Sequence, residues 1–232
     1  MFVVILILIL SLSLLFFLSI KSSFGEHKKV LNKFIYYNEK NKKIDHFKEE
    51  LEEQKDALEF IDSTDIVLEL GGRYGTVSNA IAYKQNNSGN LIVVEPDTSV
   101  ISALTNNKNI NKMNYTIINN YISNTPKNFT KAGYGSMTLS SKNEYDPLMI
   151  SYSEFKNKFP LKFNVLVADC EGCLGEFLEM IGDDIHNYNK ILFEADQPKM
   201  CDYDLILNKL HKLGFKTVKK NFNAVYRYVL IK

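Results

Sequence analysis

Residues 67–75 read Val67-Leu68-Glu69-Leu70-Gly71-Gly72-Arg73-Tyr74-Gly75, and residues 91–96 read Leu91-Ile92-Val93-Val94-Glu95-Pro96. Each is a short apolar run with a carboxylate near its end, which is typical of a buried strand in a parallel sheet. The glycines after the first run predict a tight turn that opens a helix. Because ligands of open α/β sheets bind beyond the carboxyl ends of the strands, both carboxylates are predicted to face a ligand site.

The spacing of the glycines restricts which nucleoside ligand fits. The dinucleotide fingerprint G-x-G-x-x-G brings the backbone close to a pyrophosphate. Neither a register that starts at Gly71 nor one that starts at Gly72 supplies the second and third glycines of that motif. The chain instead carries an acid-x-Gly-x-x-x-Gly pattern, formed by Glu69, Gly71 and Gly75. This spacing argues against a nicotinamide dinucleotide.

The pattern resembles the first motif of class I S-adenosylmethionine-dependent methyltransferases, and further segments narrow the resemblance to the FkbM type. Residues 94–107 are similar to the E-P…L…N stretch of that family, and residues 165–173 to its fourth strand and I-D-x-E-G signature. Residues 115–120 and 149–155 are similar to its third strand and to the run before strand four. The chain departs from the family at Gly71-Gly72-Arg73, where Gly-Ala-Asn is usual, and at Cys173.

The resemblance implies an α/β fold of the Rossmann-like class I methyltransferase type. Such a fold has a seven-stranded, mostly parallel sheet with helices on both faces. It also implies S-adenosylmethionine as cofactor, with the loop at Gly71 and Gly75 around its methionine end and Glu95 on both ribose hydroxyls. At most one of Asn119 and Asn120 is expected near the adenine, with Asn120 preferred. Tyr74 is expected either against the sulfonium, as a cation–π partner, or in packing.

Methyl transfer requires a positioned acceptor and often the removal of its proton, and residues after strands four and five face the reacting centre. Asp169 is the first candidate, because it can orient the methionine amine or the acceptor hydroxyl. Glu171 is the second, as base or substrate ligand, although Glu171-Gly172 also reads as a helix start. Glu194 and Asp196 are weaker candidates for substrate contact.

Cys170-Glu171-Gly172-Cys173 has C-x-x-C spacing, but no second pair completes a zinc site and the strand pattern differs from that of thioredoxins. Two small buried residues beside the cofactor are therefore expected rather than a redox or metal centre. No metal is predicted. Three cysteines fit a reduced compartment without requiring one.

The chain of 232 residues has a net charge of +1, from 28 basic and 27 acidic side chains, so no overall field favours nucleic acid. Residues 2–20 are uncharged and span about 28 Å as a helix, close to the thickness of a hydrocarbon core. We therefore expect residues 1–20 to form a transmembrane helix, with a cleaved signal sequence as the alternative. Residues 21–43 form a lysine-rich linker that favours a cytosolic domain, while a lumenal or secreted one stays open.

Residues 44–232 are the predicted methyltransferase domain. Apolar residues recur at helical spacing from Ile44 to Ile61, which predicts an amphipathic helix packed on the sheet. The polar, glycine-containing stretch 123–147 is expected to be a loop that covers the substrate, as in the family resembled. The histidines His46 and His211 are expected to be solvated.

Together these patterns predict a membrane-anchored enzyme that methylates a hydroxyl. The resemblance suggests a sugar, glycan or glycolipid acceptor, whereas the residues show no acceptor specificity. The alternative is a non-catalytic, membrane-tethered binding module on the same fold. A disulfide-exchange protein that uses Cys170 and Cys173 is a further alternative. The oligomeric state and the identity of the catalytic base are not predicted.

Overall fold

The computed structural model describes residues 25–232 apart from 49, 133–134 and 141–145, and it divides the chain into units 1–35 and 36–232. Residues 25–31 of the first unit are helical. Among the described residues, no helix is both long enough and apolar enough to span a bilayer. The predicted anchor at residues 1–20 lies outside the described residues. Residues 36–43, which were predicted to belong to the linker, fall within the second unit.

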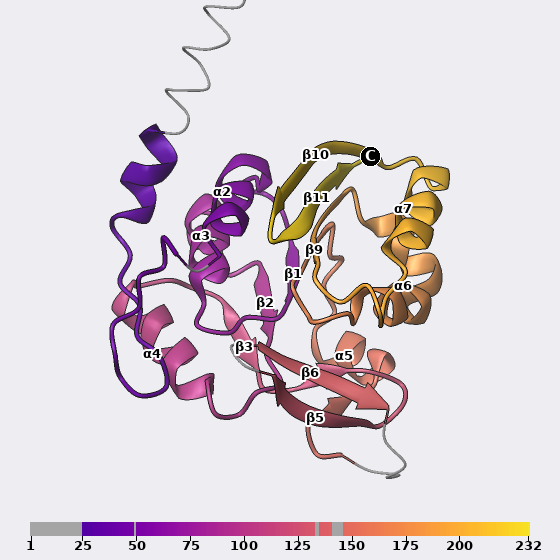
Figure 1. Ribbon diagram of the computed structural model, residues 1–232, viewed down its shortest axis with the longest axis horizontal. Helices are drawn as coiled ribbons and strands as arrows, with labels where there is room; N and C mark the ends of the chain where they lie inside the picture. Colours follow the sequence, from indigo (N-terminus) through magenta and orange to yellow (C-terminus); the bar gives the residue numbers. More distant parts are fainter. Residues whose placement is uncertain (1–24, 49, 133–134, 141–145) are drawn as a thin grey trace, which may run out of the picture. The chain divides into compact units, whose positions relative to one another are not determined.

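A seven-stranded sheet forms the centre of the second unit (Figure 1), in the order β10-β11-β9-β8-β1-β2-β3. Its strands are β1 (Val67–Leu70), β2 (Leu91–Val94), β3 (Thr116–Ile118), β8 (Val165–Ala168), β9 (Lys190–Ala195), β10 (Lys216–Asn223) and β11 (Val225–Ile231). Neighbouring strands from β9 to β3 are parallel, whereas β11 is antiparallel to both of its neighbours. This arrangement confirms the predicted seven-stranded, mostly parallel sheet.

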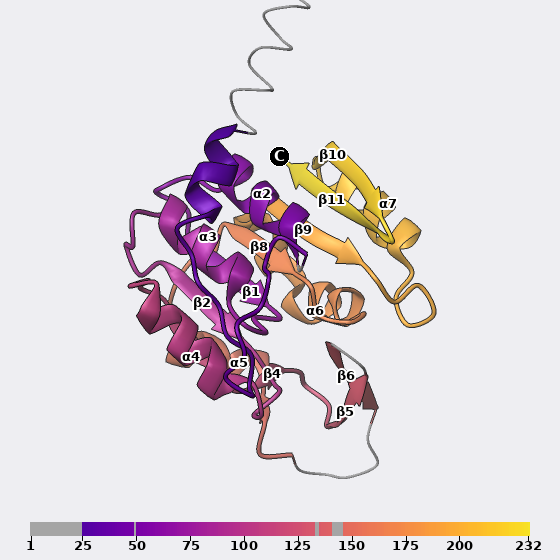
Figure 2. The ribbon, with the colours of Figure 1, turned by 60° about the vertical axis from the view of Figure 1, so that its left-hand side comes forward.

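Helices cover both faces of the sheet, with α2 and α3 on one side and α6 and α7 on the other (Figure 2). They are α2 (Leu51–Phe60), α3 (Thr76–Lys84), α4 (Ile101–Ile110), α5 (Tyr152–Lys158), α6 (Leu174–Ile181) and α7 (Tyr203–Lys212), with a 3-10 helix at Gly182–Asn187. Alternate strand residues such as Leu68, Ile92 and Leu166 share one buried cluster with Phe155 of α5 and Phe177 of α6. Strands buried on both faces explain the continuous apolar runs of the sequence.

The amphipathic run that predicts a helix from Ile44 to Ile61 forms one only from Leu51, where α2 begins. Glu50 has φ 55°, in the left-handed region, so a right-handed helix cannot continue through it and α2 begins only at Leu51. His46 lies outside the helix and is buried, with its Nδ1 3.1 Å from Gln54 Oε1. The prediction of a solvated His46 was therefore wrong, because the tertiary fold brings Gln54 over it. His211 is exposed, as predicted.

The stretch 123–147 does not form one long loop. It contains an antiparallel hairpin of β5 (Lys127–Ala132) and β6 (Gly135–Ser140), which lies apart from the main sheet (Figure 2). Two further short strands, β4 (Tyr121–Ile122) and β7 (Met149–Ile150), pair with each other at its base. The hairpin was not predicted, because only β6 shows an alternation of polar and apolar residues, at Met137 and Leu139, and β5 carries two lysines and an asparagine. Its covering role stays a prediction.

Candidate active site

A cavity of about 370 Å³ lies at the carboxyl ends of β1, β2 and β8, where the sequence predicted a ligand site. Its walls come from the loops after these three strands, from the segment between β4 and β5, and from the first turn of α6. Glu50, just before α2, and Met200, just before α7, complete the lining. This volume is within the range of small-ligand sites.

The turn after β1 is built around Gly71, which has φ 92°. The Gly71 N–H donates to the Val94 carbonyl at 2.9 Å, and the Asp169 N–H donates to the Leu70 carbonyl at 3.0 Å. A Cβ atom at residue 71 would lie 1.8 Å from the Asp169 carbonyl oxygen. Only glycine therefore allows the loop after β1 to touch the loop after β8.

Glu95 follows β2, lines the cavity and is 3% exposed. Its Oε2 accepts from the Arg73 N–H and its Oε1 from the Asp97 N–H, both at 2.7 Å. Burial raises the pKa of Glu95, and the two amide hydrogen bonds oppose that shift. Each carboxylate oxygen has two lone pairs, so each can accept a further hydrogen bond from a ligand in the cavity.

The ionisable groups of the lining carry a net negative formal charge. They are five acids and two bases: Glu50, Arg73, Glu95, Lys127, Asp169, Glu171 and Glu176. Both bases are already paired, Arg73 with Asp97 at 3.2 Å and Lys127 with Glu176 at 2.6 Å. The cavity therefore favours a ligand that carries positive charge.

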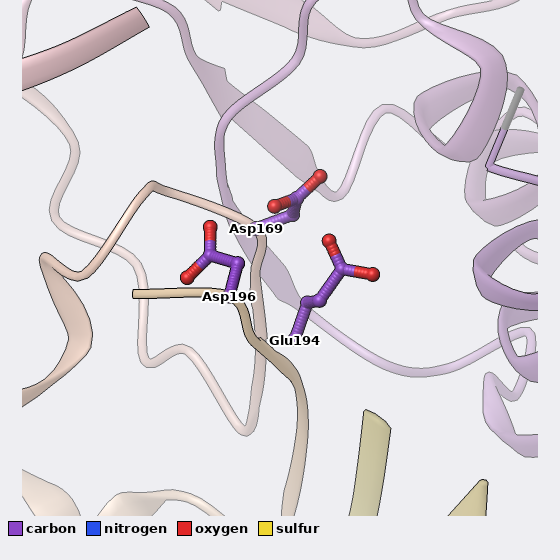
Figure 3. Close-up of side chains that lie close together, drawn as sticks. All are labelled: Asp169, Glu194 and Asp196. Atoms are coloured by element: carbon purple, nitrogen blue, oxygen red, sulfur yellow. The ribbon is translucent and has the colours of Figure 1, made fainter. Parts of the chain in front are cut away.

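Asp169 lines the cavity, and its side chain lies close to those of Glu194 and Asp196, which do not line it (Figure 3). Asp169, Glu194 and Asp196 each place one oxygen within 4.8 Å of the others. Burial raises the pKa of Asp169 well above its ordinary range, and the nearby Glu194 carboxylate raises it further. Burial likewise raises the pKa of Glu194 to about 8, although Arg227 Nη1 lies 3.0 Å from Glu194 Oε1. Asp169 is therefore a stronger base than an ordinary carboxylate and is suited to take up a proton.

The sequence predicted these residues at the tips of strands four and five, facing one reacting centre, but not that their carboxylates come this close together. The chemistry of the group allows two states. Oxygen donors so close together can share protons or coordinate a hard divalent cation, and each state offsets their repulsion. Two protein groups already contact the cluster, because Arg227 pairs with Glu194 and the Tyr203 hydroxyl donates to Asp196 Oδ1 at 2.8 Å. These two contacts, together with the raised pKa values of Asp169 and Glu194, favour the state in which the carboxylates share protons.

Glu171 lies in a short loop between β8 and α6 and has φ 51°. Its Oε2 accepts from Gln197 Nε2 at 2.7 Å, and it lines the cavity. The two cysteines that flank the loop, Cys170 and Cys173, form a disulfide and are half-buried. The expectation of two small buried cysteines beside the cofactor was therefore wrong, because the helical start at Cys173 brings its sulfur back to Cys170.

Four predicted cofactor residues do not line the cavity among the residues that the structure describes. Gly75 has φ 79° and precedes α3, where a Cβ would lie 2.8 Å from both Leu104 Cδ1 and the Tyr115 hydroxyl. Tyr74 is buried with Val100 and Ala103, so its placement favours the packing role.

The other two predicted cofactor residues outside the lining are Asn120 and Glu69. The Asn120 Nδ2 donates to the Leu148 carbonyl at 3.1 Å, away from the lining. Asn119 Nδ2 donates to the carbonyl of Glu95 at 2.8 Å, which ties the end of β3 to the end of β2. Glu69 is 1% exposed, beneath the loop that follows β1.

Burial raises the pKa of Glu69 from the usual 4.5 to about 8. Between those pH values the folded chain holds more protons than the unfolded chain, so stability falls as pH rises. Glu69→Gln should remove this contribution of up to about 1.4 kcal/mol per pH unit. Urea unfolding at pH 5, 6.5 and 8 should show that the free energy of unfolding of the variant increases relative to that of the wild type as pH rises. A constant difference, as expected for the exposed control Glu179→Gln, would contradict a buried protonated Glu69.

Sequence reasoning missed several lining groups because they come from distant segments. Lys127 and Glu176 are 49 residues apart, and the Ser123 hydroxyl donates to Glu176 at 2.9 Å. Glu50 reaches the site from before α2 and accepts a hydrogen bond from the Thr76 hydroxyl. No local periodicity marks these residues. Only the run of acids in residues 49–53 offered a signal for Glu50.

Comparison with solved structures finds the same fold at low sequence identity. An rRNA methylase from Streptococcus thermophilus matches with a TM-score of 0.50 and 11% identity, covering 77% of this chain and 93% of that chain. A precorrin 8W decarboxylase from Methanobacterium thermoautotrophicum matches with a TM-score of 0.49 and 14% identity, over 79% and 90%. A ribosomal protein L11 methylase from Lactobacillus delbrueckii subsp. bulgaricus matches with a TM-score of 0.47 and 12% identity, over 78% and 77%.

No protein-family model and no curated protein sequence matches the chain. Membership of the FkbM type therefore stays a prediction. The match to the rRNA methylase covers most of both chains, and the sheet of this chain has the strand order β3-β2-β1-β8-β9-β11-β10 with an antiparallel β11. The second unit of the chain has the fold of the class I S-adenosylmethionine-dependent methyltransferases.

Proposed function

We propose that the chain binds S-adenosylmethionine and transfers its methyl group to a hydroxyl. The observation that carries this proposal is Glu95, a buried carboxylate after β2 that faces the cavity beside the Gly71 turn. The ribose of the cofactor offers two neighbouring hydroxyl donors, which a carboxylate at this place can accept. The glycines of the turn after β1 do not have the G-x-G-x-x-G spacing that cradles a pyrophosphate, which argues against a nicotinamide dinucleotide.

The charge and shape of the cavity support the same ligand. S-adenosylmethionine carries a sulfonium and an ammonium group against one carboxylate, and the lining has an excess of acids. Val94, Pro96 and Ile122 supply apolar surface next to Glu95, as a flat base requires. Glu50 is the acid that we assign to the cationic end, because it lines the cavity close enough to Asp169 to raise the pKa of that residue.

When bound, the cofactor supplies an electrophilic methyl group, so the protein needs only to place an acceptor and handle its proton. We assign Asp169 as the base that accepts the proton of the acceptor hydroxyl, because its pKa is raised. The neighbouring carboxylates of Glu194 and Asp196 help to hold that proton. Glu171 is assigned to orient the acceptor, since Gln197 fixes its carboxylate at the cavity wall.

The acceptor that we propose is a sugar, glycan or glycolipid. The resemblance to FkbM-type enzymes supports this class, and the polar groups Ser123, Lys127 and Glu176 offer hydrogen bonds to a molecule rich in hydroxyls. The uncharged residues 1–20 are proposed to anchor the domain to a membrane, on its cytosolic side, near such lipids. Nucleic acid is not the proposed acceptor, because the net charge of the chain is only +1 and provides little attraction for phosphates.

One observation favours a second candidate, a binding module without catalysis. The Arg73 N–H already occupies Glu95 Oε2, and Arg73 has φ 41° in a loop that departs from the resembled family. If that contact excludes the ribose, the fold remains and cofactor binding is lost.

Calorimetric titration of the full chain in mild detergent separates the two candidates. S-adenosylmethionine and S-adenosylhomocysteine should bind with micromolar affinity, and NADH should not bind. Absence of binding in a demonstrably folded chain would support the non-catalytic module.

Glu95→Ala should weaken the binding of S-adenosylmethionine by about 1–3 kcal/mol, which is about 5- to 150-fold in Kd, because two charge-assisted hydrogen bonds are lost. Glu179→Ala serves as a matched control, since the Glu179 side chain is 73% exposed and lies outside the cavity lining. Unchanged affinity of the Glu95 variant would sink the assignment of the ribose site. Circular dichroism checks that the loss of the Arg73 and Asp97 contacts leaves the fold intact.

A further inference from the structure

The wall of the cavity contains a disulfide that the proposed reaction does not use. Cys170 and Cys173 are bonded to each other, and both line the cavity together with the two residues between them. In-line methyl transfer from S-adenosylmethionine to a hydroxyl requires no thiol of the protein. The third cysteine, Cys201, is buried and free.

The bridge does little to hold the overall fold. It closes a loop between residues only three apart in the chain, and the entropic effect of a disulfide grows with the length of the loop that it closes. The loop connects β8 to α6, which are both fixed independently by the buried cluster that contains Leu166 and Phe177. The disulfide therefore constrains the loop itself rather than the domain.

The conformation of this loop is one that a free chain avoids. Glu171 has φ 51° and Gly172 has φ 90°, so two successive residues are in the left-handed region. The first of them is not glycine, and such a residue persists only where its surroundings enforce the conformation. The bond between Cys170 and Cys173 is the covalent part of that enforcement.

The loop is coupled to a second segment of the cavity wall. Glu171 accepts a hydrogen bond from Gln197, and a Cβ on Gly172 would lie 3.0 Å from Gln197 Cβ and 3.1 Å from Met200 Cβ. Met200 itself lines the cavity. A change in the bridged loop therefore moves both Glu171 and the segment 197–200 that packs on it.

The site also has features of disulfides that exchange with thiols. Both cysteines are half-buried at the cavity rather than enclosed in the core, so a small or extended reductant can approach them. Cys173 is the residue before the first turn of α6, and a helix N-terminus stabilises a thiolate. A stabilised thiolate at Cys173 favours the reduced form of the cysteine pair.

We propose that Cys170 and Cys173 form a redox-active site whose reduction by a dithiol loosens the cavity wall and weakens cofactor binding. The inference rests on the proposed function for its binding readout. In the exchange, a thiolate of the reductant attacks one sulfur and the S–S bond breaks. A second thiol then resolves the mixed disulfide, so two electrons and two protons reach the cysteines and the dithiol becomes a disulfide.

The test uses the full chain equilibrated in buffers of reduced and oxidised dithiothreitol. Alkylation and mass spectrometry should count one free thiol in the oxidised chain and three after reduction, since the chain has three cysteines. The Kd for S-adenosylmethionine should rise by about fivefold or more on reduction, which is the low end of coupling between two sites. Cys170→Ser/Cys173→Ser should bind like the reduced chain in both buffers. Cys201→Ser, outside the cavity lining, should switch like the wild type.

A second readout does not depend on the cofactor. A glutamate-specific protease should cleave after Glu171 faster in the reduced chain and in the double serine variant than in the oxidised chain. A bridge that dithiothreitol does not reduce, or that never forms, would overturn the inference. So would reduction that changes neither Kd nor cleavage at Glu171. If neither redox state binds S-adenosylmethionine, the proposed function fails, and faster cleavage on reduction still supports the redox site.

Discussion

Asp169→Asn is expected to lower the rate of methyl transfer by about 10²- to 10⁴-fold, the range that a positioned general base contributes. The affinity for S-adenosylmethionine should change far less. Asparagine keeps the size of the side chain but cannot accept the proton of the acceptor hydroxyl. Transfer of a radiolabelled methyl group to glycolipid and oligosaccharide fractions that the wild type methylates measures the rate, and calorimetry measures the affinity.

The matched control for Asp169→Asn is Asp196→Asn. Asp196 belongs to the same group of carboxylates but does not line the cavity, and its Oδ1 accepts from Tyr203 at 2.8 Å, a contact that asparagine can keep. The control removes one negative charge from the group without removing the proposed base, so it should retain most of the rate. An equal loss of rate and affinity in Asp169→Asn would recast Asp169 as a cofactor ligand. An equal loss of rate in both variants would show that only the charge matters.

Gly71→Ala is expected to lower the free energy of unfolding by about 2–5 kcal/mol. About 1–2 kcal/mol comes from the left-handed conformation at φ 92°, and about 1–3 kcal/mol from the overpacking that the new Cβ causes. That Cβ would lie 1.8 Å from the Asp169 carbonyl oxygen, a backbone atom that cannot rotate away. Urea denaturation measures the loss, and a loss of this size is a large part of the stability of an ordinary domain.

Gly214→Ala separates the two contributions. Gly214 has φ 93°, almost the value at Gly71, but a Cβ there would meet no atom within 4 Å. Its loss should be limited to the conformational part, about 1–2 kcal/mol. The difference between the two variants then reports the contact between the loops after β1 and β8. Equal losses would show that these loops do not pack as closely as the structure places them.

Local patterns of the sequence were enough to predict the elements of the sheet. The run that ends at Leu70 forms β1 and the run that ends at Val94 forms β2. The helix start that Glu171-Gly172 suggested leads into α6 at Leu174. Hydrophobic periodicity, β-branched residues and glycine turns depend only on residues that are close together in the chain. A single sequence therefore displays them whatever its tertiary contacts are. The same information determined the parallel strands and therefore the edge of the sheet at which the cavity lies.

The contents of the cavity were decided only by the tertiary structure. The pairing of β8 with β9 sets Asp169 beside Glu194, and the packing of α2 delivers Glu50 from outside the sheet. The bond of Cys170 to Cys173 and the removal of Tyr74 into a packed cluster likewise depend on which faces meet. Contacts between residues far apart in the chain are set by strand register and helix packing, and neither leaves a signal in the spacing of one sequence.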